Sequence, residues 1–145
     1  MCQDRAMPHA PALRLATSSD LDVLAARDRH LRPERLAASI AAGQVLVVDG
    51  REGILGWLRW GFFWDEIPFM NMLFVLVPAR GRGLGGSLVE DWEARARADG
   101  HDAVLTSTRS DEAAQHFYRR RGYADAGVLL LPDEPAELLL RKELR

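Results

Sequence analysis

Two spacings of hydrophobic residues alternate along the chain and predict a mixture of strands and helices. Short apolar runs predict strands at residues 13–17, 45–48, 54–63, 71–77, 103–108, 128–131 and 137–140. Apolar residues at helical spacing predict helices at residues 21–25, 32–42, 84–98 and 111–121. Most of these segments begin at a polar residue or a proline and are followed by a glycine, as helices commonly are. In the third helix, Leu84, Leu88, Trp92 and Ala96 recur every four residues and mark its buried face.

The order of these elements predicts the fold class. One strand, two helices, three strands, a helix, a strand, a helix and two strands fit a single α/β domain. We expect a mixed, mostly antiparallel sheet of about seven strands with about four flanking helices, covered on both faces because several strands are apolar throughout. Residues 1–12 carry no period, so they are expected to form a flexible leader before one domain at 13–145.

Composition then narrows the classes of function. A chain of 145 residues that is 48% hydrophobic can build one self-sufficient core. The formal net charge of −2 gives no field for nucleic-acid binding, and no apolar stretch approaches the roughly 18 residues of a membrane span. The only cysteine is Cys2, and the four histidines lack ligand spacing, so the sequence predicts no metal site. We therefore expect a cytoplasmic protein without nucleic-acid or membrane partners.

The most informative segment is a glycine-rich turn between the strand at 71–77 and the helix at 84–98. Its sequence is Arg80-Gly81-Arg82-Gly83-Leu84-Gly85-Gly86-Ser87. Glycines expose consecutive backbone N–H groups, a helix N-terminus adds the positive end of its dipole, and two arginines add full charges. This pattern predicts a cradle for an anion such as a pyrophosphate.

Two other phosphate-binding motifs compete for this turn. A P-loop is excluded because Ser87 stands where that motif requires lysine. The dinucleotide fingerprint Gly-x-Gly-x-x-Gly is matched by Gly81, Gly83 and Gly86, but the place about 20 residues beyond it, where an acidic residue would hold a ribose hydroxyl, is occupied by Thr106-Ser107-Thr108-Arg109. Arg109 lies near that place and suits a 2′-phosphate, so an NAD(P)-binding oxidoreductase stays open as an alternative.

Two motifs about 35 residues apart carry a resemblance to a known family. Residues 80–85 resemble the Arg/Gln-x-x-Gly-x-Gly/Ala acetyl-CoA signature of the GNAT superfamily of N-acetyltransferases. Residues 114–123, Ala-Gln-His-Phe-Tyr-Arg-Arg-Arg-Gly-Tyr, resemble that family's Ala-x-x-Phe-Tyr-x-x-x-Gly-Phe/Tyr element. The resemblance spans nearly the whole chain and implies the acyl-CoA N-acyltransferase fold, acetyl-CoA as donor, an amine as acceptor, and no metal.

The resemblance also implies residue roles. The end of the strand at 71–77 would pair through its backbone with the pantetheine arm of acetyl-CoA, and the turn would hold the pyrophosphate. The implied cofactor-binding residues are Phe74, Val75, Leu76, Val77, Arg80, Gly81, Arg82, Gly83, Leu84, Gly85, Gly86, Ser87, Asp111, Phe117 and Tyr118. Asp111 departs from the family's frequent asparagine. Its carboxylate cannot donate the amide hydrogen bond to the cofactor, so we expect it only to cap its helix.

Tyr118 matches the tyrosine that protonates the departing thiolate in many members of the family. The chemistry fits, because an ordinary phenol has a pKa near 10 and a thiol near 8.5. Tyr118 therefore stays protonated at neutral pH and suits a general acid. A backbone N–H near Phe74 or Val75 would stabilise the oxyanion.

The acceptor side is less marked in the sequence. The family's common glutamate on the strand at 71–77 is absent, so we predict Asp65 or Glu66 as the general base that deprotonates the amine. Trp64, Asp65, Glu66, Asn71 and Ser107 are the candidate substrate-binding residues. We expect a small-molecule amine, with a protein N-terminus or side chain and a non-catalytic acyl-CoA-binding module as alternatives. The resemblance also implies a possible homodimer.

Overall fold

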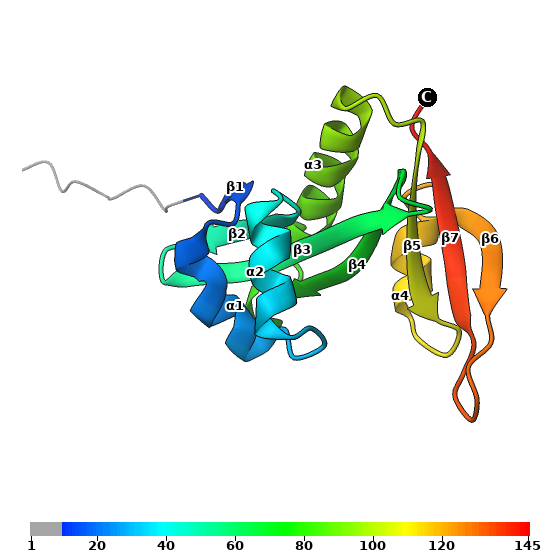
Figure 1. Ribbon diagram of the computed structural model, residues 1–145, viewed down its shortest axis with the longest axis horizontal. Coiled ribbons are helices and arrows are strands. Elements are labelled where there is room, and N and C mark those ends of the chain that lie inside the picture. Colours follow the sequence, from blue (N-terminus) through cyan, green and yellow to red (C-terminus); the bar gives the residue numbers. More distant parts are fainter. Residues whose placement is uncertain (1–9) are drawn as a thin grey trace, which may run out of the picture.

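The computed structural model describes residues 10–145, which form an α/β domain around one seven-stranded sheet (Figure 1). The strands are β1 (Ala12–Leu15), β2 (Val45–Gly50), β3 (Gly53–Phe63), β4 (Ile67–Val75), β5 (Ala103–Arg109), β6 (Ala124–Leu129) and β7 (Glu137–Glu143). The helices are α1 (Leu21–Arg27), α2 (Pro33–Ala41), α3 (Leu84–Ala98) and α4 (Ala114–Arg119), with short 3₁₀ turns η1 (Ser18–Asp20) and η2 (Val77–Ala79). The predicted element order and fold class are confirmed.

The strand order is β1-β2-β3-β4-β5-β7-β6. Every neighbouring pair is antiparallel except β4 and β5, which are parallel. This topology differs from the all-parallel sheet in which a dinucleotide fingerprint normally acts. It therefore removes the structural context that the oxidoreductase alternative requires.

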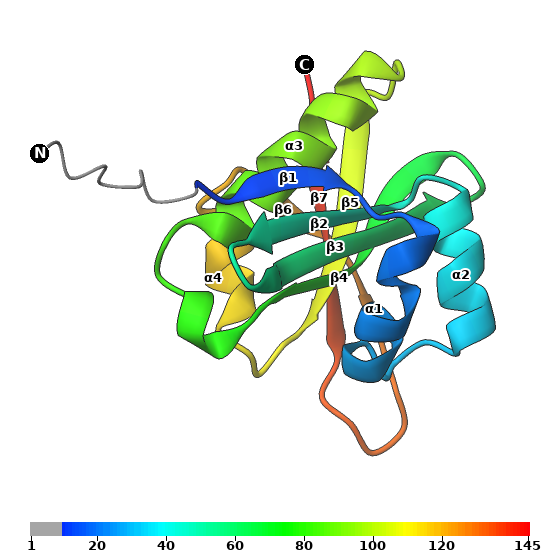
Figure 2. The same ribbon diagram turned by 90° about the vertical axis from the view of Figure 1, so that its left-hand side faces the viewer.

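Helices cover both faces of the sheet, as the continuous apolar strands predicted (Figures 1 and 2). Strand β2 shows the reason, because its successive side chains point to opposite faces. Val45 and Val47 pack with Leu24 of α1 and Leu36 of α2, and the intervening Leu46 packs in the cluster formed with α3. Two hydrophobic clusters therefore sandwich β2, β3 and β4.

Strands β4 and β5 diverge, and this opens the centre of the sheet. They pair only at Phe69 with Leu105 and at Met70 with Thr106. Just beyond this point β4 contains a bulge at Asn71, because Trp60 of β3 pairs with Met70 and its neighbour Arg59 pairs with Met72. The remaining length of β4, up to Val75, is left unpaired on its β5 side and can receive a ligand.

Some predicted boundaries shift. Strand β4 begins at Ile67, four residues before the predicted start. Pro68 does not prevent this, because a proline is tolerated near the first residue of a strand, and it pairs with Phe62 of β3. Strand β4 also ends at Val75, so Val77 lies in η2 and not on the strand. Helix α4 begins at Ala114 and has Ala113 as its N-cap, so Asp111 does not cap it.

The predicted leader, residues 1–12, falls mostly outside the described residues, and Cys2 lies there as well. Its last residue, Ala12, begins β1. Across residues 10–145, no helix is long and apolar enough to cross a membrane. Within the same range, no group of three or more His, Cys, Asp and Glu side chains is arranged to hold a metal ion.

Candidate active site

Two pockets meet where β4 and β5 diverge, and Tyr118 of α4 lies in the wall between them. One pocket, of about 390 Å³, runs along the end of β4 toward the start of α3. The other, of about 440 Å³, lies between β4 and β5 on the opposite side of Tyr118. Leu73, Ala114 and Tyr118 line both pockets. A group bound in one pocket can therefore meet a group bound in the other beside the Tyr118 side chain.

The first pocket is the glycine cradle predicted from the sequence. Gly81 and Gly83 have φ angles of +81° and +77°, which side chains rarely adopt. Gly83 is the N-cap of α3, so the turn delivers the chain directly into the first turn of that helix. The free N–H groups there and the helix dipole favour an anion.

The structure brings most of the predicted cofactor-binding residues to this cradle. Its lining includes Phe74, Val75, Arg80, Gly81, Gly83, Leu84, Gly85, Gly86, Phe117 and Tyr118. Arg80 is held there by a hydrogen bond from its Nε to the Val75 carbonyl, and its guanidinium lies over the Phe74 ring.

The other five predicted residues do not line the cradle. These are Leu76, Val77, Arg82, Ser87 and Asp111. Ser87 donates its hydroxyl hydrogen bond to the Gly83 carbonyl, and the Asp111 carboxylate accepts two hydrogen bonds from Arg109 at 3.1 Å. Both side chains are thus engaged with their own chain, and a contact of either with the cofactor stays a prediction.

Arg121 is a cradle residue that the sequence reasoning did not single out. Its guanidinium carbon lies 3.9 Å from the Phe117 ring centroid, and it packs so close to Gly86 that a Cβ there would meet its Nη2 at 2.4 Å. Its Nε is buried without a hydrogen-bond partner. A cation packed against the positive end of α3, with Arg80 in the same cradle, favours the binding of an anion there. The run Arg119-Arg120-Arg121 was the available signal, but it did not show which arginine turns inward.

Tyr118 is almost fully buried between two aromatic rings. Its ring meets Phe117 at 5.2 Å and Tyr123 at 5.6 Å, both edge to face. Burial raises the pKa of the Tyr118 phenol above its usual value, and the Thr106 hydroxyl lowers it by a smaller amount. The phenol therefore keeps its proton at neutral pH and has a hydrogen to donate in the wall between the pockets.

A polar network inside α3 and β7 supports that ring. The Tyr123 hydroxyl donates to one oxygen of the buried Glu93 at 2.9 Å, and Lys142 Nζ donates to the other at 2.7 Å. Burial and the neighbouring Glu93 carboxylate raise the pKa of Tyr123, so it also stays un-ionised. The Tyr123 ring, which packs edge to face on Tyr118, restricts the orientation of the Tyr118 side chain.

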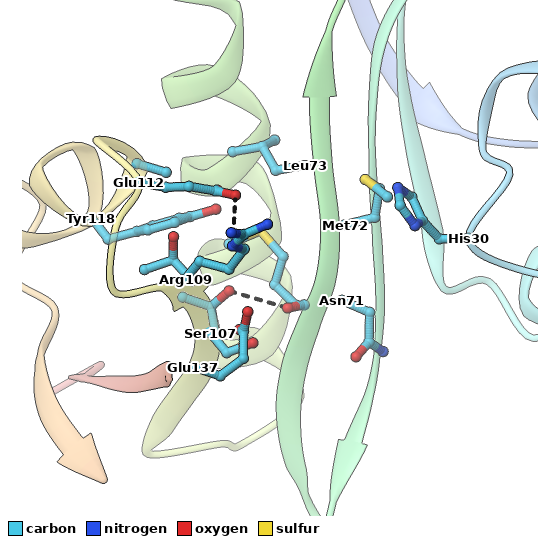
Figure 3. Close-up of a pocket in the computed structure, with 13 residues that line it drawn as sticks. His30, Asn71, Met72, Leu73, Ser107, Arg109, Glu112, Tyr118 and Glu137 are labelled. Atoms are coloured by element: carbon cyan, nitrogen blue, oxygen red, sulfur yellow. Dashed lines mark hydrogen bonds and ion pairs between the residues drawn. The ribbon is translucent and has the colours of Figure 1, made fainter. Parts of the chain in front are cut away.

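The second pocket is polar and holds two of the predicted substrate-binding residues, Asn71 and Ser107. In Figure 3, Tyr118, Arg109 and Glu112 lie on the β5 and α4 side, and Asn71, Met72 and His30 lie toward β4. Glu112 and Glu137 supply its carboxylates, and Arg109 lies 3.6 Å from Glu112. Protonated amines suit a pocket with this acidic lining.

The structure does not bring Trp64, Asp65 and Glu66 to Tyr118. They form the tight turn between β3 and β4, in which Trp64 and Asp65 have positive φ angles, and Trp64 is largely exposed. Asp65 and Glu66 line a separate shallow depression with Phe62 and His101. From Glu66 to Leu73 the extended strand covers roughly 20 Å, which is too far for direct proton transfer at the shared wall. The site carboxylates are instead Glu112 and Glu137, which only the folded sheet brings there.

Comparisons with known proteins agree with this geometry. The acetyltransferase (GNAT) domain family matches residues 41–125. A blasticidin-S acetyltransferase from Streptomyces morookaense is 34% identical over 116 residues, which cover 78% of this chain and 79% of that protein.

Solved structures show the same fold. A GNAT-family acetyltransferase from Bacillus cereus has a TM-score of 0.77 at 21% identity, covering 93% of this chain and 98% of the other. An acetyltransferase from Salmonella typhimurium, solved with its cofactor acetyl-CoA, has a TM-score of 0.79 at 16% identity. The match covers 94% of this chain and 95% of the other. The glycine cradle, with its positive helix end and the partnerless Nε of Arg121, fits the diphosphate of that cofactor. This chain belongs to the GNAT acetyltransferase family and uses acetyl-CoA as its acetyl donor.

Proposed function

We propose that the protein transfers the acetyl group of acetyl-CoA directly to the amino group of a small molecule. The observation that carries this proposal is that Tyr118 lies in the wall shared by the glycine cradle and the acidic pocket. A relative 34% identical to the chain is a blasticidin-S acetyltransferase, which supports a small-molecule acceptor. The cytoplasmic location and the homodimer expected from the sequence stay predictions.

When bound, acetyl-CoA supplies an acetyl group activated as a thioester. The cradle residues hold its diphosphate, and the unpaired edge of β4 up to Val75 offers backbone groups to its extended arm. We keep the backbone N–H of Phe74 or Val75 as the proposed oxyanion donor. Tyr118 then holds a proton for the leaving sulfur, because its raised pKa keeps the phenol un-ionised.

We propose Glu137 as the general base in place of Asp65 and Glu66. Among the described residues the Glu137 carboxylate forms no ion pair, whereas the Glu112 carboxylate forms one with Arg109. Its position on β7, paired with Arg109 of β5, gives it a place in the acceptor pocket beside Ser107. A water held by Ser107 or Asn71 can carry the amine proton to this carboxylate.

Replacing Glu137 with glutamine is therefore expected to lower kcat on the order of 10²-fold, because the isosteric amide cannot accept the proton. Steady-state release of the CoA thiol measures kcat. The KM for acetyl-CoA is expected to stay unchanged. The matched controls are Asp65→Asn and Glu66→Gln, which should keep wild-type rates. A slow Glu66→Gln enzyme beside a normal Glu137→Gln enzyme would reverse this assignment.

Replacing Arg121 with glutamine is expected to raise the Kd of acetyl-CoA by about tenfold, since one charge-assisted contact to a phosphate is lost. Isothermal titration with acetyl-CoA measures the change. S-acetylpantetheine, which lacks the nucleotide, should bind equally to both proteins. Arg120→Gln is the control, because Arg120 is exposed and does not line the cradle. Equal losses in both variants would show a general charge effect and not a cradle contact.

The proposed function itself is tested with an acceptor panel. CoA-thiol release is measured with blasticidin S, simple primary amines, a peptide with a free N-terminus and an N-blocked peptide with one lysine. Turnover with small amines supports the proposal. Turnover with peptides alone would identify a protein acetyltransferase. Tight acetyl-CoA binding with no thiol release for any acceptor would indicate a non-catalytic binding module.

A further inference from the structure

A third recess adjoins the acceptor pocket. It lies toward β6, the edge strand of the sheet (Figure 1). Its volume is about 430 Å³. Asn71, Ser107 and Glu137 line both this recess and the acceptor pocket, so the two spaces share one polar wall. A molecule with its amino group near Tyr118 can extend into the recess past these three side chains.

The rest of the recess is apolar. Phe62, Phe63 and Phe69 form one side, and the rings of Phe63 and Phe69 stack with centroids 6.2 Å apart. Val128, Leu129 and Leu139 form the opposite side.

Much of this apolar lining is exposed. Val128 is 55% exposed and Leu129 52%, and neither residue belongs to either hydrophobic cluster of the fold. Exposed apolar side chains gathered around one recess mark a binding surface. Its continuity with the acceptor pocket indicates which ligand it serves.

We propose that this recess is a second acceptor subsite, which takes an aromatic or branched aliphatic group carried by the amine. The proposal rests on the proposed function, because the amino group must lie in the acidic pocket. Carboxylates of Glu112 and Glu137 suit the cationic end of such an acceptor, and the six apolar side chains suit the other end. The preferred acceptor is therefore amphipathic, with its charge and its apolar group at opposite ends.

The first measurement is kcat/KM for three primary amines with the same reacting group: ethylamine, hexylamine and 4-phenylbutylamine. Burying the longer tails in the recess is expected to raise kcat/KM at least tenfold from ethylamine to 4-phenylbutylamine, mostly through KM. Equal values for the three amines would overturn the subsite while leaving the acetyltransferase function intact. Turnover with peptides alone would instead refute the proposed function.

The second measurement uses matched variants in neighbouring positions. Leu129→Ser removes one apolar wall residue, and Leu130→Ser changes the next residue, which is 79% exposed and does not line the recess. Leu129→Ser should lower kcat/KM for 4-phenylbutylamine at least threefold and leave ethylamine unchanged. Leu130→Ser should change neither. Because both positions are exposed, a thermal shift with acetyl-CoA is expected to show that both variants fold.

Two further results would contradict the proposal. If Leu129→Ser lowered kcat/KM equally for all three amines, the residue would support the fold or the chemistry and not a tail subsite. If light scattering showed a wild-type dimer that Leu129→Ser converts to a monomer, the apolar surface would belong to a second copy of the chain.

Discussion

Replacing Tyr118 with phenylalanine is expected to lower kcat on the order of 10²-fold while the Kd of acetyl-CoA stays within about twofold of wild type. The ring packs between Phe117 and Tyr123, and phenylalanine preserves those contacts. Only the proton that the leaving sulfur receives is lost. Single-turnover release of the CoA thiol measures the chemical step, and isothermal titration measures binding.

The pH dependence gives a second readout for Tyr118. Burial raises its pKa above the value of 10.0 expected in the unfolded chain, so the unfolded state loses this proton first as pH rises. The stabilisation associated with the neutral phenol is therefore fully present below about pH 10 and is lost as pH rises through the folded-state pKa. Tyr118→Phe should show a shallower alkaline loss of stability, with the remaining part due to Tyr123.

Tyr123→Phe is the control for this interpretation. This variant deletes the hydrogen bond to Glu93 but leaves the Tyr118 hydroxyl in place. It should therefore lower the free energy of unfolding and leave kcat close to the wild-type value. A Tyr118→Phe enzyme with full single-turnover rates between pH 6 and pH 9 would exclude Tyr118 as the acid. A water or another donor would then have to protonate the sulfur.

The cofactor half of the site was predictable because its chemistry is contained in one continuous segment. Gly81 and Gly83 require left-handed backbone angles, and a strand before them and a helix after them appear in the local sequence pattern. Tyr118 was found through a second local motif, and the structure places it in the wall beside the cradle. The local sequence pattern was therefore enough to predict most of the residues that line the cradle.

The acceptor half was not predictable in the same way, because sheet pairing assembles it from distant segments. Glu137 reaches the pocket only because β7 inserts between β5 and β6 and pairs with Arg109. Glu66 is nearer to Asn71 in sequence, yet the extended strand carries it away from Tyr118. Arg121 turns into the cradle because Gly86 leaves room for its guanidinium, which is a tertiary contact that the arginine run does not reveal.

The loop between α1 and α2 shows how a buried charge pair supports the acceptor side. Asp28 ends α1, and its carboxylate accepts a hydrogen bond from Arg59 Nε of β3 at 3.0 Å. The Asp28 side chain is 0% exposed and that of Arg59 only 9%. This pair fixes the start of the loop that carries His30 to the acceptor pocket, and Arg59 pairs directly with Met72 of the same pocket.

Replacing Asp28 with alanine is expected to lower the free energy of unfolding by about 3–5 kcal/mol, because it leaves the Arg59 guanidinium buried without its counter-charge. Urea unfolding followed by tryptophan fluorescence measures the loss. The matched control is Asp91→Ala, which removes the more exposed pair between Asp91 and Arg95 on α3 and should cost about 0.5 kcal/mol or less.

A double variant separates the buried charge from the lost packing. Asp28→Val combined with Arg59→Met removes both charges while keeping the summed side-chain volume close to that of the native pair, and it should recover most of the stability that Asp28→Ala loses. Its KM for the acceptor should still be raised, because the charge pair that fixes the loop near His30 is gone, whereas its Kd for acetyl-CoA should match wild type. If the double variant were as unstable as Asp28→Ala, the pair would stabilise the fold through its shape and not through its charge. If the KM of the double variant for the acceptor were unchanged, apolar contacts alone would fix the loop.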